Sequence, residues 1–253
     1  MSALIVIPAR YDSTRLPGKP LLKKTGKFLI QHVYERATRA RRAQSVVVAT
    51  DDSRIVDAVR SFQGMVVLTR RDHESGTDRI AEVASRPEFQ SFQTVVNVQG
   101  DEPEVSPELI DDLIRLVEIG GVQMTTAAAP FDNHAQIADP GVVKVVTDHR
   151  RFALYFSRSV IPFDRDGLTR KGGMLELAGL YRKHLGIYAY NRTFLLEFCA
   201  AAPCELEKLE KLEQLRALYL GAKILVQDTP IAPHGIDTPE DYEAFCRRMM
   251  PGG

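Results

Sequence analysis

The sequence predicts an α/β protein built on a doubly wound, mainly parallel sheet. Short apolar runs rich in β-branched residues alternate with segments whose apolar residues recur at helical spacing. The runs are continuous rather than alternating, which is typical of strands covered on both faces. The 253 residues, 44% of them hydrophobic, suffice for one large α/β domain.

Strands and helices alternate regularly through the first half of the chain. A strand at 3–8 is followed, after a loop, by a helix at 28–42. The next expected elements are a strand at 45–51, a helix at 53–62, a strand at 65–68, a helix at 77–85, a strand at 94–103 and a helix at 106–120. Ser106 and Pro107 mark the start of the helix at 106–120, because Ser caps a helix and Pro fits its first turn.

The second half is more mixed. We expect strands at 142–148, 151–159 and 182–191, a helix at 205–221 closed by Gly221, a strand at 223–228 and a helix at 238–250. No helix long enough to make a crossover separates the first two of these strands. We therefore expect a single domain over 1–253 with a smaller β-rich insertion around 125–190. An exposed, mobile loop is expected at 166–179.

Charge and cysteine usage argue against several classes of protein. Lys plus Arg equals Asp plus Glu at 33 each, so the strongly basic balance of a nucleic-acid-binding protein is absent. No apolar run is long enough for a membrane span, and the first residues resemble a strand more than a signal peptide. Cys199, Cys204 and Cys246 lack CxxC spacing and are odd in number. We therefore expect no disulfide or zinc site, and a reducing cytoplasm.

The loop after the first strand, "ARYDSTRLPGKP", is unusually basic. Arg10, Arg15 and Lys19 lie on a backbone stiffened by two prolines, while Gly18 permits close approach of a ligand. Arg binds phosphate oxygens bidentately and Lys acts as a point charge, so a polyphosphate is the expected ligand. The alternative is a solvated basic loop. The loop matches neither common Gly-rich phosphate motif.

Three further loops carry candidate ligands. Ser75 and Gly76 lead into a helix whose free amides can contact a nucleotide, or Ser75 merely caps that helix. Asp101 follows an apolar strand and suits Mg²⁺ beside a polyphosphate, although its neighbours also suit an ordinary turn. Asp237 precedes the last helix and is either a helix cap or a second metal ligand.

The predicted helix at 205–221 has an unusual apolar pattern. Leu206, Leu209, Leu212, Leu215 and Leu218 recur every third residue and sweep a broad sector rather than a narrow stripe. This pattern predicts a helix contacted on several sides, as at a subunit interface, more than a coiled coil.

Seven segments in order resemble the 3-deoxy-manno-octulosonate (KDO) cytidylyltransferases. They are "IPARYDSTRLPGKPL", "SGTDRIAE", "VVNVQGDEP", "ALYFSRSVIPFDRD", "HLGIYAYNRTFL", "LEKLEQLRAL" and "GIDTPEDYE". The resemblance extends from residue 4 to about residue 247. It implies a nucleotide-diphospho-sugar transferase fold, whose β-rich insertion serves sugar binding and dimerisation. It also implies a homodimer that joins CTP and KDO to give CMP-KDO and pyrophosphate for lipopolysaccharide biosynthesis.

The resemblance assigns roles to individual residues. Catalysis is implied for Lys19, Arg10, Asp101 and Asp237, and nucleotide binding for Arg10, Arg15, Lys19, Ser75 and Gly76. Mg²⁺ is implied at Asp101 and Asp237, with a second Mg²⁺ held largely by the CTP phosphates. Sugar binding is implied for Gln99, Arg158, His184, Tyr188, Glu213 and Gln214. Arg158 is the natural partner of the sugar carboxylate.

Two alternatives to this function stay open on the sequence. The first is the same chemistry on a related sugar acid, such as 8-amino-KDO or a sialic acid. The second is a catalytically inert paralogue that binds nucleotide sugars, although Lys19, Asp101 and Asp237 are all present.

Overall fold

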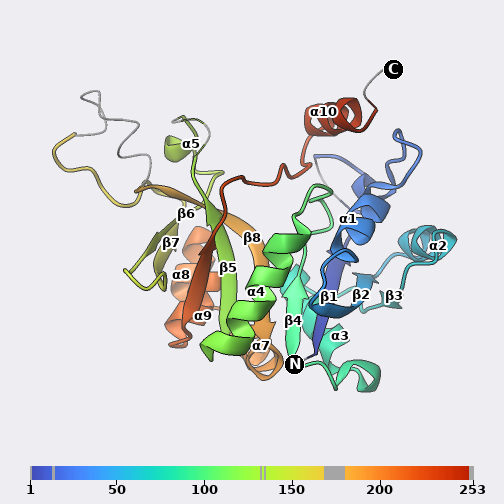
Figure 1. Ribbon diagram of the computed structural model, residues 1–253, viewed down its shortest axis with the longest axis horizontal. Coiled ribbons are helices and arrows are strands. Elements are labelled where there is room, and N and C mark those ends of the chain that lie inside the picture. The colour runs from blue at the N-terminus through green and yellow to red at the C-terminus, as the bar shows by residue number, and fades with distance from the viewer. Residues whose placement is uncertain (1, 13–14, 132, 134, 168–179, 251–253) are drawn as a thin grey trace.

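The computed structural model describes residues 2–12, 15–131, 133, 135–167 and 180–250. Within them, nine strands form one sheet, whose main path is β3-β2-β1-β4-β8-β5-β9 (Figure 1). The strands are β1 Ala3–Ala9, β2 Ala43–Thr50, β3 Val66–Leu68, β4 Thr94–Asn97, β5 Met124–Ala129, β6 Lys144–Thr147, β7 Ala153–Ser157, β8 Arg182–Asn191 and β9 Ile224–Asp228. Only β8 runs antiparallel to its neighbours on this path. The mainly parallel sheet is thus confirmed.

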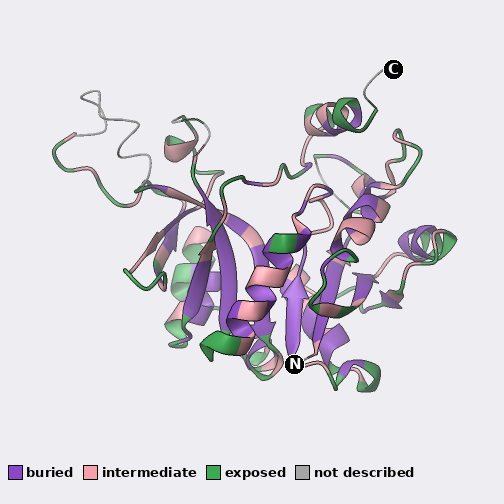
Figure 2. Ribbon diagram, in the orientation of Figure 1, coloured by how far each residue is buried: buried purple, intermediate pink, exposed green. Residues whose placement is uncertain are grey.

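Helices cover both faces of the sheet, as a doubly wound fold requires. The α-helices are α1 Leu29–Ala37, α2 Ser53–Ser61, α3 Gly76–Ser85, α4 Pro107–Gly120, α5 Ala135–Ala138, α7 Arg192–Ala200, α8 Glu205–Glu210, α9 Gln214–Tyr219 and α10 Pro239–Met249. Helices α1, α2 and α4 pack on one apolar face, and α3, α7 and α9 on the other. Alternate residues of β1 feed the two cores, Ile5 and Ile7 one and Leu4 and Val6 the other. Figure 2 shows the resulting buried strands.

Two expected helices are wrong in their extent. The helix expected at 28–42 ends at Ala37, and the next turn leads into β2. The helix expected at 205–221 is two short helices, α8 and α9, because Lys211 adopts the left-handed conformation with φ 53°. The sequence reading also overlooked β5 and α7.

The β-rich segment around 125–190 is not set apart from the sheet. Strands β8 and β5 lie within the main path of the sheet, between β4 and β9, and only β6 and β7 lie off it, with β6 pairing to β7 and β8. Most of the loop expected at 166–179 falls outside the described residues. In the part of the chain that the structure describes, no helix is long and apolar enough to cross a membrane.

Candidate active site

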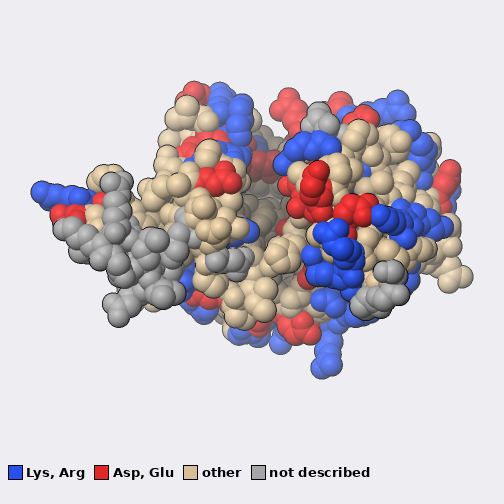
Figure 3. Space-filling view, turned by 90° about the horizontal axis from the view of Figure 1, so that it is seen from above, with Lys and Arg blue, Asp and Glu red and all other residues tan. Residues whose placement is uncertain are grey.

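The site lies where the parallel strands end. Gly100, just beyond β4, allows a close approach, because a Cβ there would lie 2.8 Å from the carbonyl oxygen of Pro8 on β1. The residues that follow β1 and β4 are thereby held together at the edge of the sheet formed by the carboxyl ends of the parallel strands. Figure 3 looks down on this edge and shows a hollow between two lobes, with basic and acidic side chains gathered on its rim.

Lys19 joins the loops at this edge. Its side chain is 12% exposed, and its Nζ donates to Asp101 Oδ2 at 2.7 Å, to Asp237 Oδ1 at 3.2 Å and to the carbonyl oxygen of Ile236 at 2.7 Å. The turn before it depends on Gly18, whose φ is 66° and whose Cβ would meet Tyr11 Oη at 3.2 Å. Acceptors from two distant parts of the chain, Asp101 and the adjacent Ile236 and Asp237, therefore converge on one ammonium group.

The two arginines of the basic loop contact different parts of the chain. Arg10 Nη2 donates to the carbonyl oxygen of His73 at 2.9 Å, on the loop before α3. Arg15 Nη2 lies 3.2 Å from Asp237 Oδ1, and its side chain is two-thirds exposed. Both guanidinium groups reach water, as binding to an incoming anion requires.

Ser75 is a helix cap. It is the N-cap of α3, accepting at Oγ from the backbone amide of Asp78 at 3.1 Å, while the Asp78 carboxylate accepts in return from the amide of Ser75. Gly76 is the first residue of α3. The cap was one of the two interpretations of Ser75, and nucleotide binding remains a prediction.

Asp237 does not cap the last helix. Thr238 is the N-cap of α10 and forms a capping box with Asp241, so the cap interpretation of Asp237 is wrong. The Asp237 carboxylate instead faces Lys19 and Arg15.

Five of the six predicted sugar-site residues line one cavity beside Asp237. The cavity has a volume of about 570 Å³, and its lining includes Gln99, His184, Tyr188, Glu213 and Gln214. Gln99 is held by donation to the carbonyl oxygen of Gly186 at 3.0 Å. Arg158 does not line this cavity. Its Nε donates to the carbonyl oxygen of Glu210 at 2.7 Å and its Nη1 to that of Pro140 at 2.9 Å.

His184 is held as a neutral ring. Burial lowers the pKa of His184 to about 3, and the ring packs against Phe156 and Tyr188 at centroid distances of 4.9 and 5.5 Å. Its Nε2 lies 3.0 Å from Thr126 Oγ1. Burial likewise raises the pKa of Tyr188. Both side chains therefore offer hydrogen bonds at neutral pH rather than charge.

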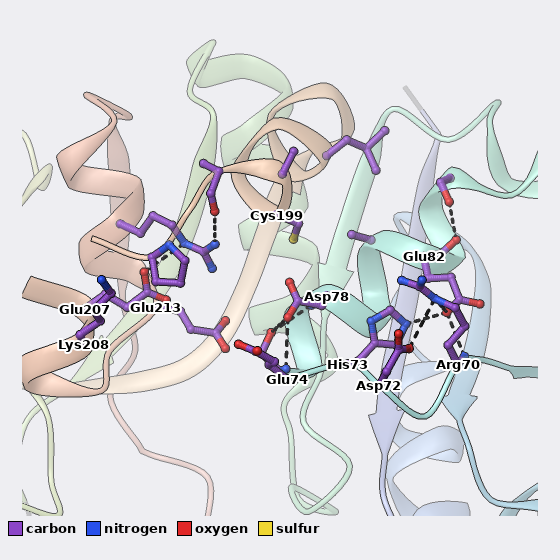
Figure 4. Close-up of a pocket in the computed structure, with 18 of the residues that line it drawn as sticks. Arg70, Asp72, His73, Glu74, Asp78, Glu82, Cys199, Glu207, Lys208 and Glu213 are labelled. Atoms are coloured by element: carbon purple, nitrogen blue, oxygen red, sulfur yellow. Dashed lines mark hydrogen bonds and ion pairs between the residues drawn. The ribbon is translucent and has the colours of Figure 1, made fainter. Parts of the chain in front are cut away.

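A larger cavity of about 1270 Å³ adjoins this one and shares Lys211 and Glu213 with it. Figure 4 shows charged side chains of α3 and the preceding loop facing those of α8 and α9 across this space. Thr77 on α3 donates to the Glu213 carboxylate and so joins the two walls.

The sequence reading missed three residues at this edge. Neither Thr77 nor Lys183 nor Glu102 was assigned a binding role from the sequence. Lys183 lines the smaller cavity. Burial, reinforced by Asp101 and Asp237, raises the pKa of Glu102 to about 8. Its Oε2 is buried and has no hydrogen-bond partner among the described residues.

Asp101 and Asp237 fit a Mg²⁺ ion. Both carboxylates already converge on one cation, the Lys19 ammonium. Across the described residues, no group of three or more His, Cys, Asp or Glu side chains forms an all-protein metal site. Mg²⁺ commonly uses one or two carboxylates together with substrate phosphates, so two aspartates suffice.

Comparison with known proteins defines the class first. A family model described as Cytidylyltransferase matches residues 4–224. A solved 4-diphosphocytidyl-2C-methyl-D-erythritol synthase from Anaerococcus prevotii shares the fold, with a TM-score of 0.63 at 14% identity over 97% of this chain and 94% of its own.

Nearer relatives then define the family. A 3-deoxy-manno-octulosonate cytidylyltransferase from Geobacter sulfurreducens is 49% identical over 98% of this chain and 100% of its own. One from Pseudomonas syringae pv. tomato is 50% identical over 97% of each chain. A solved CMP:2-keto-3-deoxy-manno-octonic acid synthetase complexed with CTP has a TM-score of 0.88 at 41% identity over 98% of both chains. The chain belongs to the family of 3-deoxy-manno-octulosonate cytidylyltransferases.

Proposed function

We propose that this protein transfers CMP from CTP to the anomeric hydroxyl of KDO, releasing pyrophosphate, as a step of lipopolysaccharide biosynthesis. The observation that carries the proposal is the convergence of Lys19, Asp101 and Asp237 beside the cavity of about 570 Å³. It puts phosphate-binding cations and metal-binding carboxylates next to a polar cavity of a size suited to a sugar acid. The names of the relatives, which match over nearly the whole chain, support the same activity.

The reaction is an in-line displacement at phosphorus. The anomeric oxygen forms a bond to the α-phosphorus of CTP as the bond from that phosphorus to the pyrophosphate oxygen breaks. Arg10, Arg15 and Lys19 hold the triphosphate, and their positive charge offsets the negative charge that grows on the leaving pyrophosphate. Ser75 and Gly76, at the start of α3, seat the nucleotide.

Asp101 and Asp237 would hold Mg²⁺ in this proposal. When bound there, with a second Mg²⁺ held largely by the CTP phosphates, the metal supplies charge stabilisation to the phosphate oxygens. Lys19 now donates to both carboxylates and to the carbonyl oxygen of Ile236, which occupies all three of its N–H donors. Before the Lys19 ammonium can donate to the triphosphate, at least one of these three hydrogen bonds must therefore break.

The sugar acid lies in the smaller cavity. Gln99, His184, Tyr188, Glu213 and Gln214 supply hydrogen bonds to its hydroxyl groups, since His184 and Tyr188 are uncharged. Arg158 takes the carboxylate in this proposal: it does not line the cavity itself, but it binds Glu210 and Pro140, whose neighbours Lys211 and Gly141 do. Among the described residues its Nη2 has no acceptor within hydrogen-bond distance, so this nitrogen is available to an anion.

A homodimer in the cytoplasm completes the proposal. Exposed apolar side chains occur at the end of the molecule formed by β7, α8 and α9, among them Leu154, Leu209 and Tyr219. The three cysteines are free, as in a reducing compartment.

Pyrophosphate release tests the activity. The full-length protein is assayed with Mg²⁺ and CTP, and KDO is compared with 8-amino-KDO and N-acetylneuraminate. We expect release with KDO that is lost on adding chelator. Release with another acid alone would overturn the sugar assignment, and no release with any acid would favour the inert paralogue.

One substitution links that activity to the proposed metal site. Asp101→Asn removes a carboxylate charge at nearly constant shape, and we expect turnover to fall by about 100-fold or more. Asp57→Asn, at an exposed position on α2, is the matched control and should leave turnover unchanged. Full activity in Asp101→Asn would remove Asp101 from the site.

A further inference from the structure

Lys144, the first residue of β6, is a buried cation held by main-chain carbonyl groups alone. Its exposed fraction is 0%. Its Nζ donates to the carbonyl oxygens of Asp139 at 2.8 Å, Val142 at 2.7 Å and Arg158 at 2.8 Å. No carboxylate of the described chain lies within ion-pair distance of it. Because burying a charge without a direct ion-pair partner is costly, a lysine here needs a reason beyond filling space.

The Arg158 guanidinium binds the same turn as Lys144. While Lys144 binds the carbonyl groups of Asp139 and Val142, Arg158 Nη1 donates to that of Pro140 at 2.9 Å. Two cations thus hold three of the four carbonyl groups of the turn at 139–142. The same turn borders the smaller cavity, whose lining includes Gly141 and Val142.

Glu210 fixes Arg158 against the second wall of the cavity. Its Oε2 accepts from the backbone amide of Arg158 at 2.8 Å, its Oε1 from Ser157 Oγ at 2.7 Å, and its carbonyl oxygen from Arg158 Nε at 2.7 Å. Lys211 and Leu212, the next two residues, line the cavity. Arg158 therefore bridges the 139–142 turn and the end of α8, and Lys144 anchors its main chain.

We propose, on the basis of the proposed function, that Lys144 is a positioning residue for the sugar-acid site. By binding the carbonyl groups of Asp139, Val142 and Arg158, its ammonium group fixes the turn that carries Arg158's acceptor. It thereby sets where the Arg158 guanidinium meets the substrate carboxylate. An apolar side chain of the same length would fill the space but leave these carbonyl groups without a donor.

Steady-state kinetics of Lys144→Met tests this role. Because only the sugar side of the site is displaced, we expect KM for KDO to rise about tenfold while KM for CTP stays within about twofold. Val117→Ala, in the core at the far end of α4, is the control for a general loss of stability. It should lower the melting temperature without changing the ratio of the two KM values. An unchanged ratio in Lys144→Met would overturn the proposal.

A double-mutant cycle separates positioning from mere stabilisation. Arg158→Ala alone should raise KM for KDO, and adding Lys144→Met should raise it little further, since Lys144 acts through Arg158. Independent, multiplying effects would overturn the proposal while leaving the activity intact. Failure of the wild-type protein to release pyrophosphate with any sugar acid would instead overturn the proposed function, and the positioning role with it.

Discussion

His184 illustrates how the environment of one residue selects its chemistry. Histidine at a sugar-acid site suggests a positive charge facing a carboxylate. The ring of His184, however, is enclosed by Phe156 and Tyr188, and burial lowers its pKa to about 3. At neutral pH it is an uncharged hydrogen-bonding group, and for this reason our proposal assigns recognition of the carboxylate to Arg158.

The same shift makes the stability of the protein depend on pH. Between about pH 6.5 and pH 3 the unfolded chain binds a proton at His184 that the folded protein does not. This group therefore lowers the free energy of unfolding as pH falls below about 6.5, by up to about 1.4 kcal/mol per pH unit. Between pH 7 and pH 5, we expect the free energy of unfolding of His184→Gln to fall by about 2 kcal/mol less than that of the wild type.

Urea denaturation at pH 7, 6 and 5 measures this difference. His149→Gln, in the exposed turn between β6 and β7, is the control and should follow the wild-type curve. Parallel curves for the wild type and His184→Gln would mean that His184 is charged in the folded protein at pH 5.

At the level of elements, the break between α8 and α9 brings residues 211–214 to the lining of the smaller cavity. Lys211 ends α8 in the left-handed conformation, and α9 then presents Leu215 and Gln214 inward while Leu209 on α8 remains exposed. A residue with a Cβ is disfavoured in that conformation, and a β-branched residue most of all.

Substitutions at this break should reveal the conformation. We expect Lys211→Val to lower the free energy of unfolding by about 1–2 kcal/mol, and Lys211→Gly to leave it unchanged or higher. Urea unfolding compares the two, with Lys208→Val on exposed α8 as the control for helix propensity. If glycine destabilised as much as valine, the left-handed turn would not exist in solution.

Sequence reasoning identified the elements whose cause is local and missed those set by packing. The first four strands and the capped helices α3 and α4 have continuous apolar runs or clear start signals. The break at Lys211 has none, because Leu, Glu and Lys all favour helix and the turn arises from tertiary contacts. Strand β5, with the sequence MTTAAA, is rich in small residues and lacks the bulky apolar run of a typical buried strand.

The same distinction holds for the site within the whole molecule. The family resemblance implied that Lys19, Asp101 and Asp237 belong to one site, and the structure brings these side chains together. The positions of Arg158 and Lys144 depend on the pairing of β6 with β7 and with β8, and the second of these pairings joins segments far apart in sequence. No local pattern marks a buried lysine that binds three carbonyl groups.

The proposed dimer is tested at the level of the whole molecule. Leu209 on α8 is 82% exposed and Leu154 on β7 is 61% exposed. Such exposed leucines at one end of a monomer indicate an interface, because covering them removes apolar surface from water. A charge placed at Leu209 would be buried at that interface without a partner. Leu209→Glu should therefore be a monomer under conditions in which the wild type is a dimer.

Sedimentation equilibrium gives the mass of each form. Leu68→Glu is the matched control, because Leu68 is 56% exposed on β3, at the opposite edge of the sheet from this end of the molecule. We expect it to sediment as two chains, like the wild type. A monomeric wild type would refute the dimer, whereas a dimeric Leu209→Glu would move the interface away from α8. Glu210 on α8 also holds Arg158. Assembly through α8 would therefore stiffen one wall of the smaller cavity, where we propose that the sugar acid binds.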